Sequence, residues 1–300
     1  MNVGIIGLGR MGGGIAQRWL EKGYTVIGFD IDAVHIKSAQ ELGVTTVRSA
    51  AEVAYDARII WLMVPAGPTV DEVLKELMPR LQPDDIIIDG GNSKFTDSIR
   101  RAQMLAAKHI FFLDCGTSGG LYGREHGYSL MVGGDQGAYD TAYPLFAAIA
   151  APGGLGRVGS SGAGHYVKMV HNGIEYGMLQ AYAEGFEILK EGSFKDQKLD
   201  LHAISGIWLH GAVIRSWLLE LAHDIFARDQ EFKTIRGEIQ ESGTGRWTVE
   251  EAQAHNIPAP VLEESLKVRE WSRKAGGNYA TKLIALLRNA FGGHAVKKNV

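Results

Sequence analysis

Cysteine is nearly absent from this sequence, since Cys115 is the only one among 300 residues. A single cysteine excludes an intramolecular disulfide and cysteine-pair metal sites, and it favours a reducing, cytoplasmic location. Charge of one sign is not in excess either, because 31 basic and 34 acidic residues leave a formal net charge of -3. No global basic field therefore favours binding to nucleic acid or to an anionic membrane.

Long hydrophobic runs and metal-ligand spacings are also missing. No run reaches the ~18 apolar residues of a membrane span, and Met1 leads directly into VGIIG, so we expect neither a membrane helix nor a leader. The 10 histidines never fall into a spacing such as HExxH, and we expect no metal site. What remains is ordinary globular composition, 45% hydrophobic and 22% charged, with enough length for two domains.

Short apolar runs alternate with amphipathic stretches over the first part of the chain. Strands are predicted at Asn2–Ile6, Tyr24–Phe29, Arg58–Val64, Asp85–Gly91 and Ile110–Cys115, with helices at Met11–Lys22, Val34–Leu42, Pro68–Leu81 and Ser98–Lys108. Continuous apolar runs between helical periods are typical of a parallel sheet buried on both faces. We therefore predict the α/β class, with an N-terminal doubly wound Rossmann domain.

The pattern changes near the glycine-rich segment Ser160–Gly164. The last strand-like run is Leu155–Gly159, and from Ala163 onward nearly every segment has helical spacing. This predicts two domains, a dinucleotide-binding domain over residues 1–160 and an all-helical domain over residues 161–300.

A GxGxxG motif, formed by Gly7, Gly9 and Gly12, lies directly between the first predicted strand and helix. These glycines permit a tight turn, close approach of a pyrophosphate, and close helix packing. The motif alone is weak, but its position at a helix N-terminus favours a dinucleotide site. The residues expected to contact the cofactor here are Gly7, Leu8, Gly9, Arg10, Met11 and Gly12.

Asp30 ends the second predicted strand, where a carboxylate can accept hydrogen bonds from the adenosine ribose. It would repel a 2′-phosphate, and no arginine follows it in IDAVH, so NAD is favoured and NADP is the alternative. Lys37 is the residue most able to weaken that preference. The other interpretation is that Asp30 only caps the following turn. Further along, the cofactor is expected to pass the end of a later strand, at Met63, Val64 and Pro65.

Five polar residues repeat at helical spacing in the segment that begins at Gly162: Lys168, His171, Asn172, Glu175 and Tyr176. At ~100° per residue they span roughly 140° of one helix face. They offer a proton acceptor, a proton donor and groups that bind hydroxyls. The alternative is an amphipathic helix whose polar side meets water. The opposite side is predicted to be core: Val167, Val170, Ile174, Met178 and Ala181.

Six motifs in order resemble those of the short bacterial form of 6-phosphogluconate dehydrogenase, and the resemblance spans essentially the whole chain. They are GLGRMG (Gly7–Gly12), DGGNS (Asp89–Ser93), TSGG (Thr117–Gly120), GAGHYVKMVHNGIEYG (Gly162–Gly177), GTGRWT (Gly243–Thr248) and RNAFGGH (Arg288–His294). The resemblance implies oxidative decarboxylation of 6-phosphogluconate to ribulose 5-phosphate and CO2 with reduction of NAD(P), a step of the pentose phosphate pathway.

The resemblance also implies residue roles. Lys168 would be the general base and Glu175 the later acid, while Asn92 would approach both nicotinamide and substrate. The other implied substrate contacts are Ser118, Gly119, Gly120, His171, Asn172, Tyr176, Arg269, Arg288 and His294. Without the resemblance, Arg269 and Arg288 could as well be helix-surface charges. In the family the terminal motif reaches a neighbouring active site, which implies a homodimer or higher oligomer with shared sites.

Departures from the family pattern leave alternatives open. Ser242 stands where the long form has a lysine before GTG(K)WT, and Arg124 and Glu125 have no assigned role. A β-hydroxyacid dehydrogenase with an unphosphorylated substrate is one alternative, and DGGNS and the arginine-histidine tail argue against it. A catalytically silent NAD-binding sensor is the other, and retention of Lys168 with Glu175 argues against that.

Overall fold

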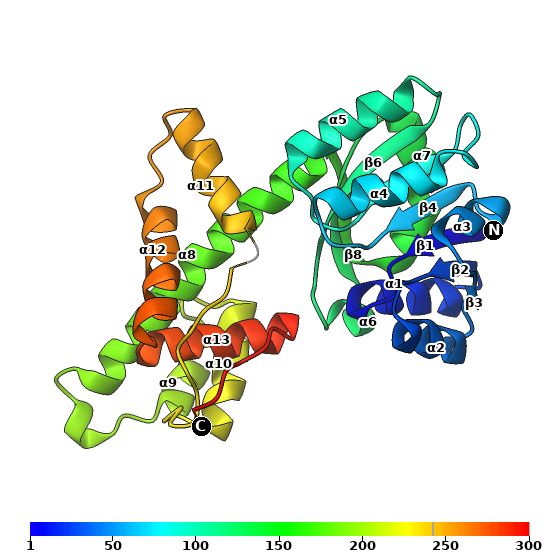
Figure 1. Cartoon of the computed structure of the whole chain (residues 1–300). Coiled ribbons are helices and arrows are strands. Elements are labelled where there is room, and N and C mark those ends of the chain that lie inside the picture. Colours follow the sequence, from blue (N-terminus) through cyan, green and yellow to red (C-terminus); the bar gives the residue numbers. More distant parts are fainter. Residues whose placement is uncertain (242, 300) are drawn as a thin grey trace. The chain divides into compact units, whose positions relative to one another are not determined.

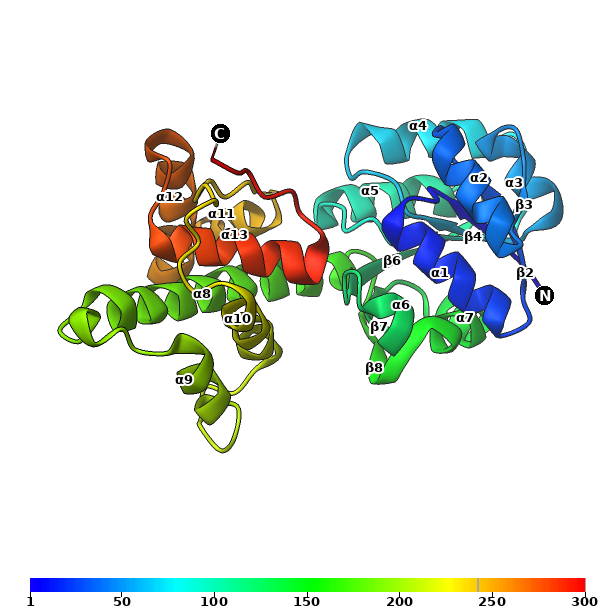
Figure 2. The ribbon, with the colours of Figure 1, turned by 90° about the horizontal axis from the view of Figure 1, so that it is seen from below.

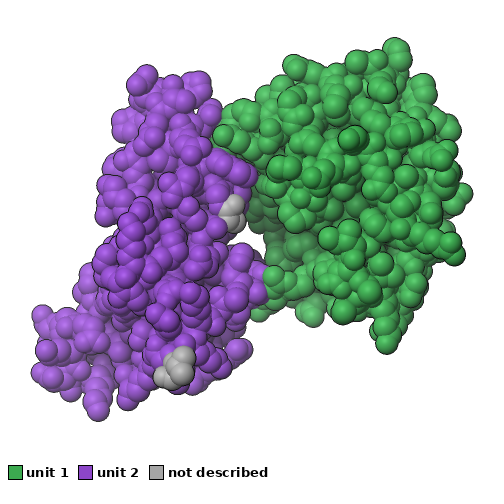
Figure 3. Space-filling model, in the orientation of Figure 1, with its two compact units in different colours: residues 1–169 green, residues 170–300 purple. Residues whose placement is uncertain are grey.

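A computed structural model describes residues 1–241 and 243–299 of the chain. The chain divides into two compact units, residues 1–169 and residues 170–300, which Figure 3 colours separately. Ser242, which stands where the long form of the family has a lysine, lies outside the described residues.

Unit 1 is built on one eight-stranded sheet with the order β3-β2-β1-β4-β5-β6-β7-β8. This order places β1 between β2 and β4, where the strand order reverses as in a doubly wound sheet, the fold that the sequence predicted. The strands are β1 (Asn2–Ile6), β2 (Thr25–Phe29), β3 (Thr45–Thr46), β4 (Ile59–Leu62), β5 (Ile86–Asp89), β6 (Phe111–Ser118), β7 (Tyr128–Gly133) and β8 (Ala150–Gly159).

The sheet is not parallel throughout, and here the sequence prediction was incomplete. The strands from β3 to β6 pair in parallel, but β6 and β7 pair antiparallel, with Asp114 opposite Gly133. Only residues 119–127 connect β6 to β7. A parallel crossover needs a dozen or more residues. The chain therefore reverses, and β8 then pairs in parallel with β7.

Helices cover both faces of the sheet (Figures 1 and 2). Buried side chains of α1 and α7 belong to one core, and those of α3, α4 and α5 belong to the other. The helices of unit 1 are α1 (Arg10–Glu21), α2 (Ala33–Leu42), α3 (Ala50–Asp56), α4 (Pro68–Leu77), α5 (Phe95–Ala106), α6 (Gly123–His126) and α7 (Gln136–Ile149).

Strand side chains alternate between these two cores. In β1, Ile5 joins the core of α1 and α7, whereas Ile6 joins the other. Trp61 makes edge contacts with Trp19 and Phe146 at ring-centroid distances of 5.7 and 5.9 Å. Full burial of each such side chain contributes roughly 1.5–3 kcal/mol. Two-sided burial explains why the strand sequences are continuously apolar.

Unit 2 is almost wholly helical, as predicted. Its core gathers side chains from several helices, among them Leu179, Phe186, Phe226 and Leu283. The helices of the rest of the chain are α8 (Ala163–Glu191), η1 (Lys195–Gln197), α9 (Leu201–Trp208), α10 (Trp217–Arg228), α11 (Thr244–Ala254), α12 (Pro260–Ala275) and α13 (Tyr279–Gly292). Helix α8 begins in unit 1 and continues into unit 2.

The buried side of α8 is not the one that its apolar pattern predicted. Val167, Ile174 and Met178 are 37%, 54% and 38% exposed, Ala181 is exposed, and Val170 is only partly buried. The prediction of a core on that side was wrong. The buried positions instead include Met169, Gly173, Tyr176, Leu179 and Ala183. Small and aromatic residues set this buried face, because α11 packs against it where glycines permit close approach.

Candidate active site

The glycine turn of unit 1 has the geometry of an anion-binding loop. Gly7 has a φ of 94°, and a methyl group in place of its hydrogen would clash with the Met63 carbonyl oxygen. Helix α1 then begins at Arg10 with Gly9 as its N-cap, which lacks a side-chain cap. No side chain at the N-cap therefore accepts hydrogen bonds from the N–H groups of the first helical turn. These N–H groups are suited to bind a phosphate.

Asp30 lies at the carboxyl end of β2 and is only 9% exposed. Its Oδ2 accepts a 2.6 Å hydrogen bond from the Leu8 N–H of the glycine turn, and its Oδ1 accepts one from the Asp32 N–H. The His35 Nδ1 lies 3.3 Å from Oδ2. Asp30 thus caps the turn, as one interpretation held, and also stands beside the nucleotide loop. Lys37 lies on α2, in the same region.

Two loops follow β4 and β5 at the same edge of the sheet. Met63 donates its N–H to the Ile6 carbonyl, and the Val64 carbonyl lies against Gly91 of the DGGNS motif. Carboxyl ends of parallel strands form the crevice in which doubly wound folds bind their ligands. The segment that contains Met63, Val64 and Pro65 therefore lies between the glycine turn and DGGNS.

Asn92 joins the DGGNS loop to the end of β6. Its Nδ2 donates to the Thr117 carbonyl at 3.1 Å, and its Oδ1 accepts from the Thr117 N–H at 3.0 Å. Ser118 ends β6, and Gly119 and Gly120 follow with φ of 129° and 50°. Left-handed backbone of this kind favours glycine. The structure thus brings Asn92 and the TSGG motif together at one edge of unit 1.

The start of α8 is fixed to the sheet by Asp114, a fully buried residue of β6 that sequence reasoning missed. Its two carboxylate oxygens accept hydrogen bonds from the N–H groups of Gly162 at 2.6 Å and His165 at 2.8 Å. A carboxylate at this end satisfies free N–H groups and opposes the positive end of the helix dipole. Lys168 follows one turn later, 6% exposed, with its stem packed against Gly116 of β6.

In unit 2 the next turns of α8 pack against the GTGRWT motif. Asn172 donates through Nδ2 to the Thr244 hydroxyl at 3.0 Å, and the Tyr176 ring lies directly on Gly245. His171 is exposed, with its Nδ1 3.1 Å from the Asn172 Oδ1. Lys168 and Tyr176 are buried, whereas His171 is exposed, so only part of the polar side of α8 faces water.

Two buried arginines stand beside Tyr176. Arg269 is 1% exposed with its guanidinium 3.4 Å above the Tyr176 ring centre, and Arg288 is 7% exposed. Among residues 1–241 and 243–299, neither forms an ion pair, and the Nη2 of Arg269 has no hydrogen-bond partner. Burial lowers the pKa of Arg269 to about 10, with repulsion from Arg288 adding to the effect, and burial also lowers the pKa of Arg288. These arginines are therefore not surface charges.

The remaining predicted residues lie at the ends of secondary-structure elements. His294 follows α13, and its ring packs against Gly292 and the Phe291 ring. Arg124 and Glu125 are in α6, whose backbone carbonyls accept hydrogen bonds from Arg18 of α1. That contact gives α6 a structural role. Together the predicted residues form two sets, one in each unit.

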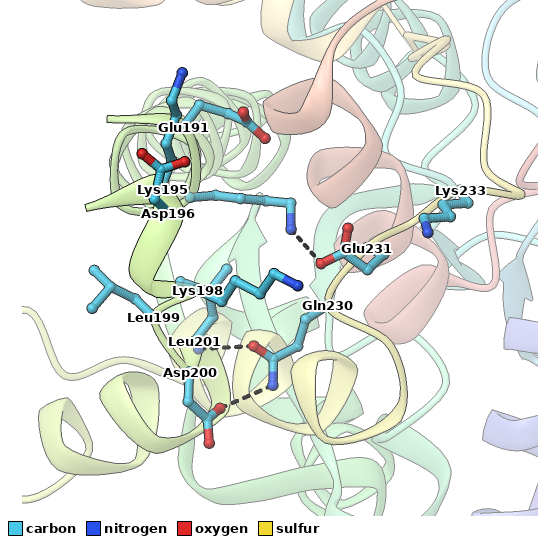
Figure 4. Close-up of a pocket in the computed structure, with 11 residues that line it drawn as sticks. Glu191, Lys195, Asp196, Lys198, Leu199, Asp200, Leu201, Gln230, Glu231 and Lys233 are labelled. Carbon is cyan, nitrogen blue, oxygen red and sulfur yellow. Dashed lines mark hydrogen bonds and ion pairs between the residues drawn. The ribbon is translucent and has the colours of Figure 1, made fainter. Parts of the chain in front are cut away.

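A pocket of about 710 Å³ lies in unit 2, away from every predicted site residue (Figure 4). Four lysines line it together with four acidic residues, so its charges balance and no ligand class is favoured. One lysine, Lys190, is already paired with Glu231 at 2.6 Å. The lining residues are Lys190, Glu191, Lys195, Asp196, Lys198, Leu199, Asp200, Leu201, Gln230, Glu231 and Lys233.

Among the described residues, no group of three or more His, Cys, Asp or Glu side chains could hold a metal ion. No helix within those residues is long and apolar enough to cross a membrane.

The Rossmann unit and helical unit, with a lysine at the start of the connecting helix, define a dinucleotide-dependent dehydrogenase. Two family models match: the NAD binding domain of 6-phosphogluconate dehydrogenase over residues 2–170, and the C-terminal domain of the same enzyme over residues 164–289. The chain therefore belongs to the 6-phosphogluconate dehydrogenase family.

Individual relatives agree with this assignment. A Haloferax volcanii protein named 6-phosphogluconate dehydrogenase, NAD(+)-dependent, decarboxylating, is 46% identical over 99% of both chains. A decarboxylating 6-phosphogluconate dehydrogenase of Cunninghamella elegans is 37% identical over 89% of this chain and 59% of its own. The solved 6-phosphogluconate dehydrogenase of Plasmodium falciparum superposes with a TM-score of 0.82, at 30% identity, over 91% of this chain and 62% of that one. Family membership favours the phosphorylated-substrate enzyme over the two alternatives.

Proposed function

We propose that this protein oxidises 6-phosphogluconate with NAD and decarboxylates the product to ribulose 5-phosphate and CO2, as a step of the pentose phosphate pathway. One observation carries the proposal beyond family membership: unit 2 buries two arginines near Tyr176, and burial lowers the pKa of both although the Glu175 carboxylate attracts them. Buried cations of this kind are costly unless an anion compensates them. A substrate phosphate is such an anion, and arginine binds it with two parallel hydrogen bonds.

The residues of unit 1 fit a dinucleotide. The open N-terminus of α1 suits the pyrophosphate, and the nearest group to a methyl on Gly9 would be His35, at 3.6 Å, so the backbone there is accessible. Asp30 would bind the adenosine ribose and disfavour a 2′-phosphate, and the Haloferax relative is named NAD(+)-dependent. When bound, NAD would supply the acceptor for the hydride that the substrate loses. The residues proposed to bind the dinucleotide are Gly7–Gly12, Asp30, Met63, Val64, Pro65 and Asn92.

Lys168 is proposed as the base that takes the proton of the C3 hydroxyl while hydride leaves C3. The resulting ketone lies β to the C1 carboxylate, so the electrons of the breaking C1–C2 bond can move into that carbonyl as CO2 departs. The Lys168 ammonium then returns its proton to the developing oxyanion and gives an enediol. Glu175 is proposed to protonate carbon in the last step. Seven helical residues separate it from Lys168, a rise of about 10 Å, which suits donors at different substrate atoms.

The other polar groups are proposed to bind substrate. Asn172, held by Thr244, and His171 would position hydroxyls, and Ser118, Gly119 and Gly120 would offer polar and backbone groups to the sugar acid. Tyr176, Arg269, Arg288 and His294 would bind the phosphate. These assignments place the dinucleotide in residues 1–160 and the phosphate in residues 161–300, the domain division that we propose.

We also propose a homodimer or higher oligomer in a reducing cytoplasm. The exposed apolar side of α8, with Ile174 at 54% and Met178 at 38%, supports burial against another copy, because monomers rarely expose contiguous apolar stripes. The single buried cysteine supports the compartment.

Lysine replacement tests the chemistry directly. We expect Lys168→Met to lower the rate of 6-phosphogluconate-dependent NADH formation by about 10²–10⁴-fold, because the base is gone. The matched control is Lys190→Met on the same helix, whose lysine pairs with Glu231 and should keep turnover near wild type. Turnover unchanged in Lys168→Met would remove lysine from the mechanism.

The substrate is tested with the wild-type protein. NADH and CO2 should form together from 6-phosphogluconate, and gluconate or another unphosphorylated hydroxyacid should be a poor substrate. Preference for the unphosphorylated compound would overturn the phosphate assignment and favour the β-hydroxyacid dehydrogenase alternative.

A further inference from the structure

Arg101 is a fully buried arginine of α5 whose side chain contacts three residues on two segments of unit 1, the start of α4 and the end of β5. Its Nε and Nη2 donate to the two carboxylate oxygens of Asp71 at 3.0 and 2.9 Å. Its Nη2 also donates to the Gly67 carbonyl at 2.8 Å, and its Nη1 lies 3.5 Å from the buried Asp89 carboxylate. A guanidinium is planar and rigid, so these contacts fix the start of α4 relative to the end of β5.

The three partners belong to the two loops at the nucleotide edge of the sheet. Gly67 is the N-cap of α4 and ends the loop that starts at Met63, while Asp71 lies in the first turn of α4. Asp89 ends β5, and its own oxygens accept hydrogen bonds from the Gly91 N–H at 3.0 Å and the Ser93 hydroxyl at 2.7 Å. Arg101 therefore connects the far end of the first loop to the carboxylate that shapes the second.

These loops have little freedom at their other ends. The Met63 carbonyl lies against Gly7 of the glycine turn, and the Val64 carbonyl lies against Gly91. A movement of Gly67 or Asp89 would therefore be transmitted to the residues that flank the proposed cofactor site, because packed groups resist displacement.

The neighbouring arginine provides a contrast within the same helix. Arg100 also donates to both oxygens of Asp71, at 2.9 and 3.0 Å, but its side chain is 53% exposed. Within the described residues, no hydrogen bond or ion pair joins it to Gly67 or Asp89. It shares the charge and one partner of Arg101 without the bridge between loops.

We infer that Arg101 is a positioning residue for dinucleotide binding: it holds the Met63–Gly67 loop and the Asp89–Ser93 loop in the arrangement that receives NAD. The inference rests on the proposed function only in that NAD is the ligand of unit 1. Arg101 does not touch the reacting atoms and acts through Gly67, Asp71 and Asp89.

The test is NAD binding to the protein without substrate, measured by titration calorimetry on Arg101→Lys and on the matched control Arg100→Lys. Arg101→Lys keeps the charge beside Asp89 but loses the fork that reaches Asp71 and Gly67 together. We expect its NAD dissociation constant to rise by about tenfold or more, because even a small displacement of the loops that Arg101 holds would misplace the groups that contact NAD. Arg100→Lys should stay within about twofold of wild type.

Two further measurements separate positioning from general damage. The dissociation constant for 6-phosphogluconate should rise by a clearly smaller factor than that for NAD in Arg101→Lys, because the proposed phosphate ligands lie in unit 2 and only Asn92 of the Asp89–Ser93 loop is proposed to reach the substrate. Asp71→Asn, which keeps Arg101 but removes one of its two carboxylate partners, should also raise the NAD dissociation constant, by a smaller factor. NAD affinity within twofold of wild type in Arg101→Lys would overturn the inference, as would equal weakening of both ligands.

Failure of the proposed function would be visible separately. If wild type and Arg100→Lys bind NAD but form no NADH from 6-phosphogluconate, the substrate assignment fails while the role of Arg101 in NAD binding is still decided by calorimetry.

Discussion

The two units each bury an arginine almost completely, and the surroundings of these two residues differ. Arg101 of unit 1 contacts two carboxylates and a carbonyl, and hydrogen bonds to Asp71 raise its pKa although burial alone would lower it. Arg269 of unit 2 has the Tyr176 ring, one long hydrogen bond of 3.4 Å to the Gln240 carbonyl, and a second arginine nearby. At Arg101 the bonded carboxylates outweigh the effect of burial on the pKa, whereas at Arg269 burial outweighs the attraction of Glu175 and Glu241. The comparison indicates that Arg101 stabilises the fold of unit 1, and it supports the proposal that Arg269 binds an external anion.

The largest expected effect is on stability, and it should appear in one unit only. Replacing Arg101 by Met leaves Asp89 as a buried carboxylate without its cation, which typically costs about 3–5 kcal/mol of unfolding free energy. At Arg269 burial outweighs the attraction of Glu175 and Glu241 and lowers the pKa, so Arg269→Met should leave stability unchanged or raise it. Chemical denaturation of both variants measures this. Equal destabilisation would mean that the two arginines do not differ in kind.

The next effect is on ligand affinity, and it should show the opposite pattern. Arg269→Met should weaken 6-phosphogluconate binding by about 1.5–3 kcal/mol, the usual contribution of a hydrogen bond to a charged group. Gluconate, which has no phosphate, should bind the variant and wild type alike. If gluconate and 6-phosphogluconate lose affinity to the same extent, Arg269 does not bind the phosphate.

The smallest effect is a pH dependence specific to unit 1. A hydrogen bond from Arg101, helped by Arg100, holds the pKa of Asp71 below its usual value of 3.8. A depressed folded-state pKa contributes stability above the unfolded value that is lost as pH falls through the folded one. The stability difference between wild type and Asp71→Asn should therefore be constant above about pH 5 and shrink below about pH 4. We expect less than about 1 kcal/mol, because the side chain is partly exposed. A difference independent of pH in thermal unfolding would contradict this account.

Much of the fold could be predicted from the sequence, because long apolar strands and the GxGxxG turn depend on local residues. Helix α1 and strand β1 are found within a residue of their predicted bounds. The short elements β3 and α3 were missed because two and seven residues are too few to show a period. The reversal at β7 was missed because strand direction depends on the length of a connection rather than on the strand's own composition.

The candidate site divides in the same way. Lys168, Asn172 and Tyr176 could be proposed from the sequence because helical spacing and family motifs mark them. Asp114 and Arg101 could not, since a buried carboxylate or guanidinium is recognised only when the fold brings its partners to it, and most of these partners are 30 to 51 residues away in the sequence. The exposed side of α8 was predicted as core because hydrophobic pattern identifies a face without identifying what covers it.

The lone thiol of Cys115 is completely enclosed in the core of unit 1, and burial raises its pKa far above that of a free cysteine. Only thiolates react readily with disulfide reagents or oxidants. In the native protein we therefore expect Cys115 to react only while the core of unit 1 is transiently open. The rate at which a thiol reagent labels Cys115 therefore measures how often the core of unit 1 opens. No engineered probe is needed, and no second cysteine contributes to the signal.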